Sequence, residues 1–122
     1  MDSNCYLRGL RDFNQEAFFK AHESLEDAWR IAPIEEKKFL QALVQLAVAF
    51  HHFSTGNMAG AGSVMKRAGQ NLASYPNRFG GLDLTSLRQS IAEWQRALSD
   101  GTPVPPLPKL EPRNPAPAEL VD

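Results

Sequence analysis

Two neighbouring stretches of the chain place hydrogen-bonding side chains at the spacing of core residues. An α-helix advances about 100° per residue, which puts His22, Glu26 and Trp29 within about 60° of one another. Gln41 and Gln45 are about 40° apart by the same rule, with His52 projecting between them. Burying such groups costs free energy unless each finds a partner. We therefore expect a buried polar cluster, either structural or lining a small pocket, made of His22, Glu26, Trp29, Gln41, Gln45 and His52.

Metal binding is a second chemistry that the first stretch could support. A histidine and a glutamate four residues apart on a helix can converge on one ion. His22-Glu23 also opens like a zinc-protease motif, but the second motif histidine is replaced by Glu26. The alternative hypothesis is therefore a metal-binding protein or metal-dependent hydrolase that uses His22, Glu23 and Glu26. We expect no cofactor, and whether the chain is an enzyme stays open.

Composition excludes several classes of function. The 122 residues suit one small domain, and a net charge of −1 without a basic stripe argues against nucleic acid. Cys5 is the single cysteine, so no intrachain disulfide can form. The most apolar stretch, Phe39–Phe53, is too short to cross a bilayer. We expect a cytoplasmic protein without a membrane partner.

The elements that must position these side chains read as an all-α fold, a small antiparallel four-helix bundle. The predicted helices span about 14–31, 34–54, 58–74 and 85–99, within a single helical domain of residues 1–101. Asn14 suits the N-cap of the first helix, with Phe13 and Phe18 at the spacing of a hydrophobic staple. Residues before Asn14, including Cys5, are expected to form a frayed end.

The short turn at Pro33 makes the first two predicted helices an antiparallel hairpin. In that register Glu26 should contact Gln41, and His22 should contact Gln45. His52 should sit about two turns from His22, and His51 should point elsewhere. Three glycines in the 58–74 helix favour close backbone packing against a neighbour.

The last predicted helix carries one apolar stripe at spacings of three and four. This stripe is expected to be core, although a homodimer seam would show the same spacing. Its members are Leu84, Leu87, Ile91, Trp94 and Leu98.

Seven of the nine prolines fall between Pro103 and Pro117, a composition typical of polyproline II helix. Val104, Leu107 and Leu110 recur every third residue and would share one edge of such a helix. We therefore expect residues 102–110 to dock on the bundle as a proline-rich strap and residues 111–122 to be disordered. The rival interpretation is a ligand for a proline-binding domain.

Several strings between about Asp12 and Leu98 resemble one known family, the domain-of-unknown-function family numbered 309. The resemblance implies a small all-helical bundle and no established activity, cofactor or substrate. It also implies a shared role for His22, Glu26, Gln41 and Gln45. The matching strings are Phe13-Asn14, Phe18-Phe19-x-Ala21-His22-Glu23, Leu25-Glu26-x-x-Trp29-Arg30, Phe39-Leu40-Gln41, Gln45-Leu46-Ala47 and Gly56-Asn57-x-x-Gly60-Ala61.

The biochemical function that these observations favour is a non-enzymatic helical binding or interaction module. Its partner would be a protein or a small polar ligand, and a homodimer stays open. Metal binding through His22, Glu23 and Glu26 is the alternative.

Overall fold

The computed structural model describes residues 3–112, which form five helices and one short hairpin. The elements are α1 (Ser3–Asn14), α2 (Phe18–Arg30), α3 (Ile34–Ser54), α4 (Met58–Leu72), β1 (Arg78–Phe79), β2 (Leu82–Asp83) and α5 (Leu84–Asp100). The two strands pair antiparallel, with Phe79 opposite Leu82. The all-α class predicted from the sequence fits this fold, apart from the two-strand sheet. Within the described range no helix is both long and apolar enough to cross a membrane.

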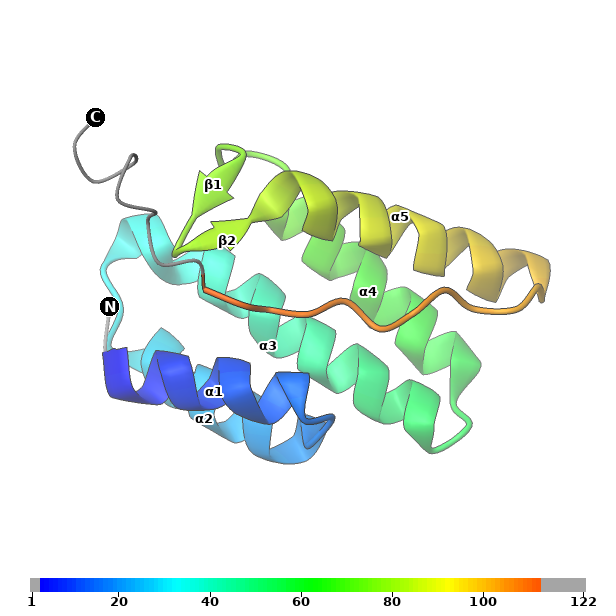
Figure 1. Ribbon diagram of the computed structural model, residues 1–122, viewed down its shortest axis with the longest axis horizontal. Helices are drawn as coiled ribbons and strands as arrows, with labels where there is room; N and C mark the ends of the chain where they lie inside the picture. The colour runs from blue at the N-terminus through cyan, green and yellow to red at the C-terminus, as the bar shows by residue number, and fades with distance from the viewer. Residues whose placement is uncertain (1–2, 113–122) are drawn as a thin grey trace.

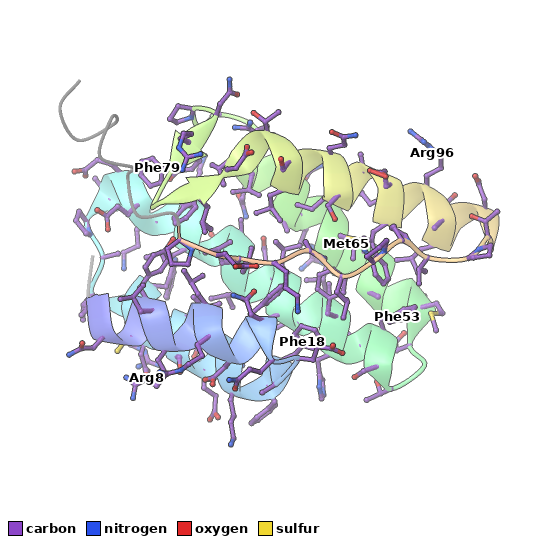
Figure 2. All side chains as sticks on the ribbon, viewed as in Figure 1. Arg8, Phe18, Phe53, Met65, Phe79 and Arg96 are labelled. Carbon is purple, nitrogen blue, oxygen red and sulfur yellow. The ribbon has the colours of Figure 1, made fainter. Side chains whose placement is uncertain are left out.

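The helices form two layers, as Figure 1 shows. Helix α1 lies in front of α2, and α5 lies in front of α4, with α3 behind the space between α1 and α5. The segment after α5, drawn in orange, turns back and runs between α1 and α5 across α3 (Figure 1). Figure 2 shows Arg8 on α1 and Arg96 on α5 pointing away from the bundle.

The core is centred on α3, because most of the apolar side chains of that helix are fully buried. Phe50 is its aromatic centre, with ring centroids 4.9 Å from Trp94, 5.8 Å from Phe13 and 5.6 Å from Phe18. The α5 stripe joins this core from Leu84 to Trp94. Since that stripe is used inside one chain, it is not available as the homodimer seam that its spacing also allowed.

Five helices replace the predicted four, because the expected frayed end is helix α1. Tyr6, Leu10 and Phe13 are buried at helical spacing, so α1 has a core-facing stripe of its own. Gly9 lies where α1 meets α2, since a Cβ there would be 2.6 Å from the Leu25 Cγ atom. Cys5 is half-buried in this helix rather than in a frayed segment.

The prediction of Asn14 as an N-cap is wrong. Asn14 is the last residue of α1, and α2 begins at Phe18 after Ala17, which makes no side-chain cap bond. The intervening turn places Glu16 at φ 63°, a left-handed conformation. The rings of Phe13 and Phe18 do pack, with centroids 5.2 Å apart, but they do so across this turn between two helices.

Helices α4 and α5 each begin at a residue whose side chain caps the first turn, and α5 ends at a glycine. Asn57 caps α4 by accepting a bond from the Gly60 amide, and α4 ends at Leu72, two residues before the predicted end. Asp83 caps α5 by accepting from the Ser86 amide, and this bond lowers the pKa of Asp83. Helix α5 ends at Asp100 because Gly101 adopts the left-handed conformation, with φ 69°.

Glycines do not mark close packing along α4, contrary to the prediction. A Cβ on Gly62 would have no atom within 4 Å, and one on Gly60 would meet only the side chain of its own cap, Asn57. Gly69 faces Ile91 at an ordinary contact distance of 3.6 Å. Close packing therefore does not offset the free-energy cost that Gly62 brings to the helix through its low helix propensity.

Two tyrosine hydroxyls tie the hairpin region to the helices. Tyr75 accepts a bond from the Phe39 amide at 3.0 Å and donates to the Glu35 carbonyl at 2.7 Å. That donor and acceptor are the two that an α-helix ordinarily pairs with each other, so this hydroxyl bridges the first turns of α3. Tyr6 on α1 donates to the Gly80 carbonyl at 2.6 Å, which fixes the hairpin turn.

Candidate functional site

Five of the six predicted site residues lie along the outer junction of α2 and α3, which we call the α2–α3 face. The expectation that they are buried is wrong, since no polar or charged side chain among residues 3–112 is buried. The side chains of His22 and Glu26 are 31% and 42% exposed, and Gln41 is exposed. The face consists of His22, Glu26 and Trp29 from α2 and Gln41 and Gln45 from α3.

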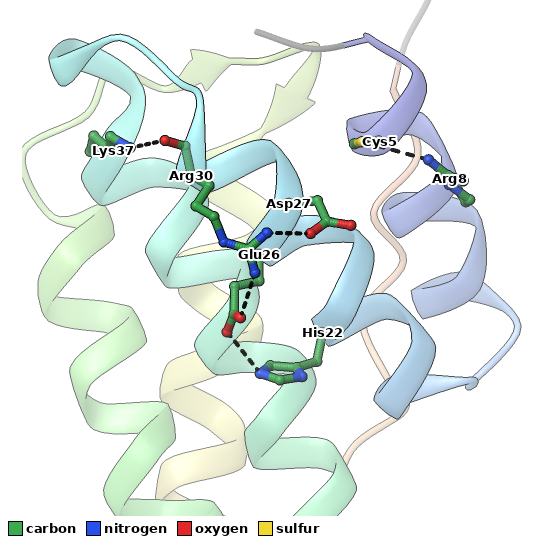
Figure 3. Close-up of polar contacts among 7 residues, drawn as sticks. All are labelled: Cys5, Arg8, His22, Glu26, Asp27, Arg30 and Lys37. Atoms are coloured by element: carbon green, nitrogen blue, oxygen red, sulfur yellow. Dashed lines mark hydrogen bonds and ion pairs between the residues drawn. The ribbon is translucent and has the colours of Figure 1, made fainter.

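A row of charged side chains runs along α2, as Figure 3 shows. The Nε2 atom of His22 lies 3.3 Å from Oε2 of Glu26, and Nη2 of Arg30 lies 3.2 Å from Oε1. Arg30 also pairs with Asp27 at 2.8 Å. These are one-turn pairs on a single helix, so Glu26 is satisfied by its own helix.

The two contacts predicted across the hairpin do not form as hydrogen bonds. Neither Glu26 with Gln41 nor His22 with Gln45 forms a hydrogen bond in the described part of the chain. Gln45 instead accepts a bond from Asn71 of α4 at 2.9 Å. The helical wheel placed the side chains on the correct sides of α2 and α3. It gave no information about Asn71, because that partner comes from a third helix.

Trp29 and Gln41 line a hollow of about 190 Å³ on this face, together with Glu26, Val44 and Gln45. The Nε1 atom of Trp29 is buried and has no hydrogen-bond partner among the described residues. The Nζ atom of Lys37 lies 4.6 Å from the centre of a Trp29 ring and also donates to the Trp29 and Arg30 carbonyls. The hollow thus combines an indole donor, adaptable amides and a nearby cation.

His51, which was predicted to point elsewhere, lines a hollow together with His22. Phe19 stands between the two imidazoles, with its ring centroid 6.2 Å from that of His22 and 6.0 Å from that of His51. These three side chains, with Phe18 and Val48, line a second hollow of about 130 Å³. His52 lies apart, with its Nδ1 atom 3.4 Å from the side-chain nitrogen of Asn57.

The three residues of the alternative metal site do not come together in the structure. Across residues 3–112 no three His, Cys, Asp or Glu side chains are placed to hold one ion. His22 and Glu26 do converge, but Glu23 lies about 100° away around the helix and is exposed. His22 and Glu26, four residues apart, therefore lie close together, whereas Glu23 points away from both.

Comparison with known proteins confirms the family resemblance. Residues 6–64 match the model of the domain of unknown function DUF309, a range that begins before and ends well before the predicted Asp12–Leu98. It includes most of α1, all of α2 and α3, and all six predicted site residues. An uncharacterized protein of Aquifex aeolicus (strain VF5) is 35% identical over 82 residues, which are 66% of this chain and 25% of that protein. The chain thus spans about a quarter of that relative, and neither match carries a stated activity.

Proposed function

We propose that this chain is a non-enzymatic helical binding module whose α2–α3 face contacts a partner protein. The observation that carries the proposal is the indole N–H of Trp29, which is buried beside the hollow without a hydrogen-bond partner. A buried donor without a partner costs about 1–3 kcal/mol. Binding that turns the indole toward the hollow and supplies an acceptor oxygen would recover that free energy.

The size of the hollows favours a protein over a small ligand. Pockets that bury most of a drug-sized molecule measure about 300–1,000 Å³. The two hollows on this face measure about 190 and 130 Å³, which suits single inserted side chains. Phe19, which lines the second hollow, is 59% exposed, and Ile31 and Ile34 at the α2–α3 turn are 65% and 85% exposed.

The charges around the first hollow indicate which kind of partner side chain would fit it. Glu26 lies 3.3 Å from His22 and pairs with Arg30, which also pairs with Asp27. Lys37 lies over Trp29 and contributes a positive charge close to the indole donor. An acidic or carbonyl-bearing side chain therefore complements this end of the face better than a basic one.

We also propose that the segment Pro103–Leu110 acts as a strap on the bundle. Its support is the burial of Leu110 and the bonds that Asn14 and Trp94 make with the segment. Burial falls toward the start, since Leu107 is half-buried and Val104 is exposed. Only the second half of the predicted apolar edge is in contact with the core. The predicted disordered tail, 111–122, lies outside the described residues from 113 onward.

Site-specific photo-crosslinking tests the proposed face. A photoreactive phenylalanine analogue in place of Gln41 should give a crosslinked product of discrete mass in source cells. The same analogue in place of Arg96, which points away from the bundle on α5 (Figure 2), should not give it. The same product at both positions, or none at Gln41, would contradict the proposal. Attachment of a small molecule alone would replace the protein partner with a ligand.

A further inference from the structure

The groove between α1 and α5 holds residues 106–110 mainly through their main chain. The indole N–H of Trp94 donates to the Pro106 carbonyl at 3.1 Å. The Asn14 side chain donates to the Leu110 carbonyl at 3.0 Å and accepts from the Leu110 amide at 2.6 Å. These three bonds reach from the first helix and the last helix to one extended stretch (Figure 1). Because these three bonds use main-chain atoms of the stretch, they do not depend on its side chains; the Lys109 side chain adds a fourth bond, to the Asn14 carbonyl at 2.9 Å.

The same contacts define the chemistry that the groove accepts. A proline has a carbonyl but no amide hydrogen, so a donor such as the Trp94 indole suits a proline-rich stretch. An asparagine carboxamide matches both polar groups of one non-proline residue, the role that Leu110 fills. The Leu110 side chain is 1% exposed and is the deepest anchor of the segment. The groove thus binds a proline carbonyl and, four residues later, a leucine.

The resident segment does not fill this site. A hollow of about 340 Å³ remains between residues 106–111 and the start of α5, beside Asp83, Ser86 and Ser90. Among the described residues, no side-chain hydrogen bond joins residues 103–105 to the bundle, and Val104 is 38% exposed. A Cβ added at Gly101, at the end of α5, would have no atom within 4 Å.

From these contacts we infer that the α1–α5 groove is a binding site for an extended proline-rich peptide of another protein, and that residues 106–110 are its resident occupant. The partner peptide takes the place of this segment and presents a proline and a leucine to Trp94 and Asn14. This site shares no residue with the α2–α3 face, so its failure and the failure of the proposed function are independent.

Peptide titration of the full-length chain tests the inference. The probe is a fluorescent synthetic peptide that copies residues 103–112. A tethered segment competes at an effective concentration of roughly millimolar, so the wild-type chain should bind the probe weakly. Leu110→Ser removes the anchor of the resident segment and leaves the groove intact. This variant should bind the probe at least about tenfold more tightly than wild type.

Two controls separate groove binding from other effects. Asn14→Ala in the Leu110→Ser background should abolish the gain, and a probe with serine at the Leu110 position should not bind. Leu110→Ala serves as the milder variant if Leu110→Ser unfolds the chain. Equal binding by wild type and both Leu110 variants, or a gain that survives Asn14→Ala, would overturn the inference. A wild-type dimer that Leu110→Ser dissociates would assign the groove to a second copy of the chain and would also overturn it.

Discussion

Asn14 binds Leu110 through both ends of its carboxamide, although the two residues are 96 positions apart. Replacing Asn14 with alanine leaves the partly buried amide and carbonyl of Leu110 without this partner. We expect Asn14→Ala to lower the free energy of unfolding by about 1–3 kcal/mol. Urea unfolding of the full-length chain followed by circular dichroism measures this loss.

The matched control for Asn14→Ala is a chain that ends at Thr102. Ending the chain there should destabilise it measurably, because Leu110 is buried, whereas ending it at Pro112 should change little. In the shorter chain Asn14→Ala should have almost no further effect. Equal melting temperatures for the two truncations would show that the proposed strap contributes nothing to stability.

Two glycines in helices should respond to alanine in opposite ways. Gly9→Ala places a Cβ 2.6 Å from Leu25 Cγ, and overpacking should outweigh the helix-propensity gain, for a net loss of about 1–2 kcal/mol. Gly62→Ala has open space and should stabilise the chain by up to about 1 kcal/mol. Thermal unfolding of both variants checks the signs. Stabilisation by Gly9→Ala would mean that α1 does not cross α2 this closely.

His22→Ala should be a mild substitution. The pair that it breaks with Glu26 is between two partly exposed side chains, and such pairs contribute less than about 1 kcal/mol. The sequence-based expectation of a buried histidine bound to Gln45 would give a larger loss, of about 1–3 kcal/mol.

Chelation with EDTA should leave the melting temperature of wild type and His22→Ala unchanged. A drop in wild type alone would restore the metal hypothesis.

Stability should fall at alkaline pH because of Tyr6. Burial raises the pKa of Tyr6, and the negative charge of Glu36 raises it further. The folded state therefore favours the neutral phenol, and its contribution is complete below the ordinary pKa of about 10 and declines as pH rises above it. Urea unfolding of wild type at pH 8 and pH 10.5 should show this decline. Tyr6→Phe should lose stability at pH 8 but decline less between the two pH values.

Periodicity predicted α2, α3, α4 and α5 because each carries one clear apolar stripe or a marked end. It did not predict α1, since Gly9 lowers the helix propensity of that short segment and Asn14 is equally typical of an N-cap. The decisive fact about Gly9 is its contact with Leu25, which no local pattern contains. The role of Asn14 is likewise set by Leu110, at the other end of the chain.

The candidate site shows the same limit. Residues on α2 and α3 were placed on the correct sides by the helical wheel, but their partners were not. His22 and Glu26 are partly exposed and pair with each other on α2. Gln45 accepts a hydrogen bond from Asn71 on α4. His51 faces α2 because its ring packs near Phe19 of that helix. The sequence of α3 alone does not determine that contact.

The most direct test of the α2–α3 face is the affinity of the crosslinked partner, once purified, for wild type and Trp29→Phe. This substitution removes the indole N–H and keeps an aromatic ring. We expect binding to weaken by about tenfold, or about 1.4 kcal/mol, measured by isothermal titration calorimetry. Arg96→Ala should bind like wild type. Unchanged affinity for Trp29→Phe, with the variant still folded by circular dichroism, would contradict the claim that this donor and its hollow contact the partner.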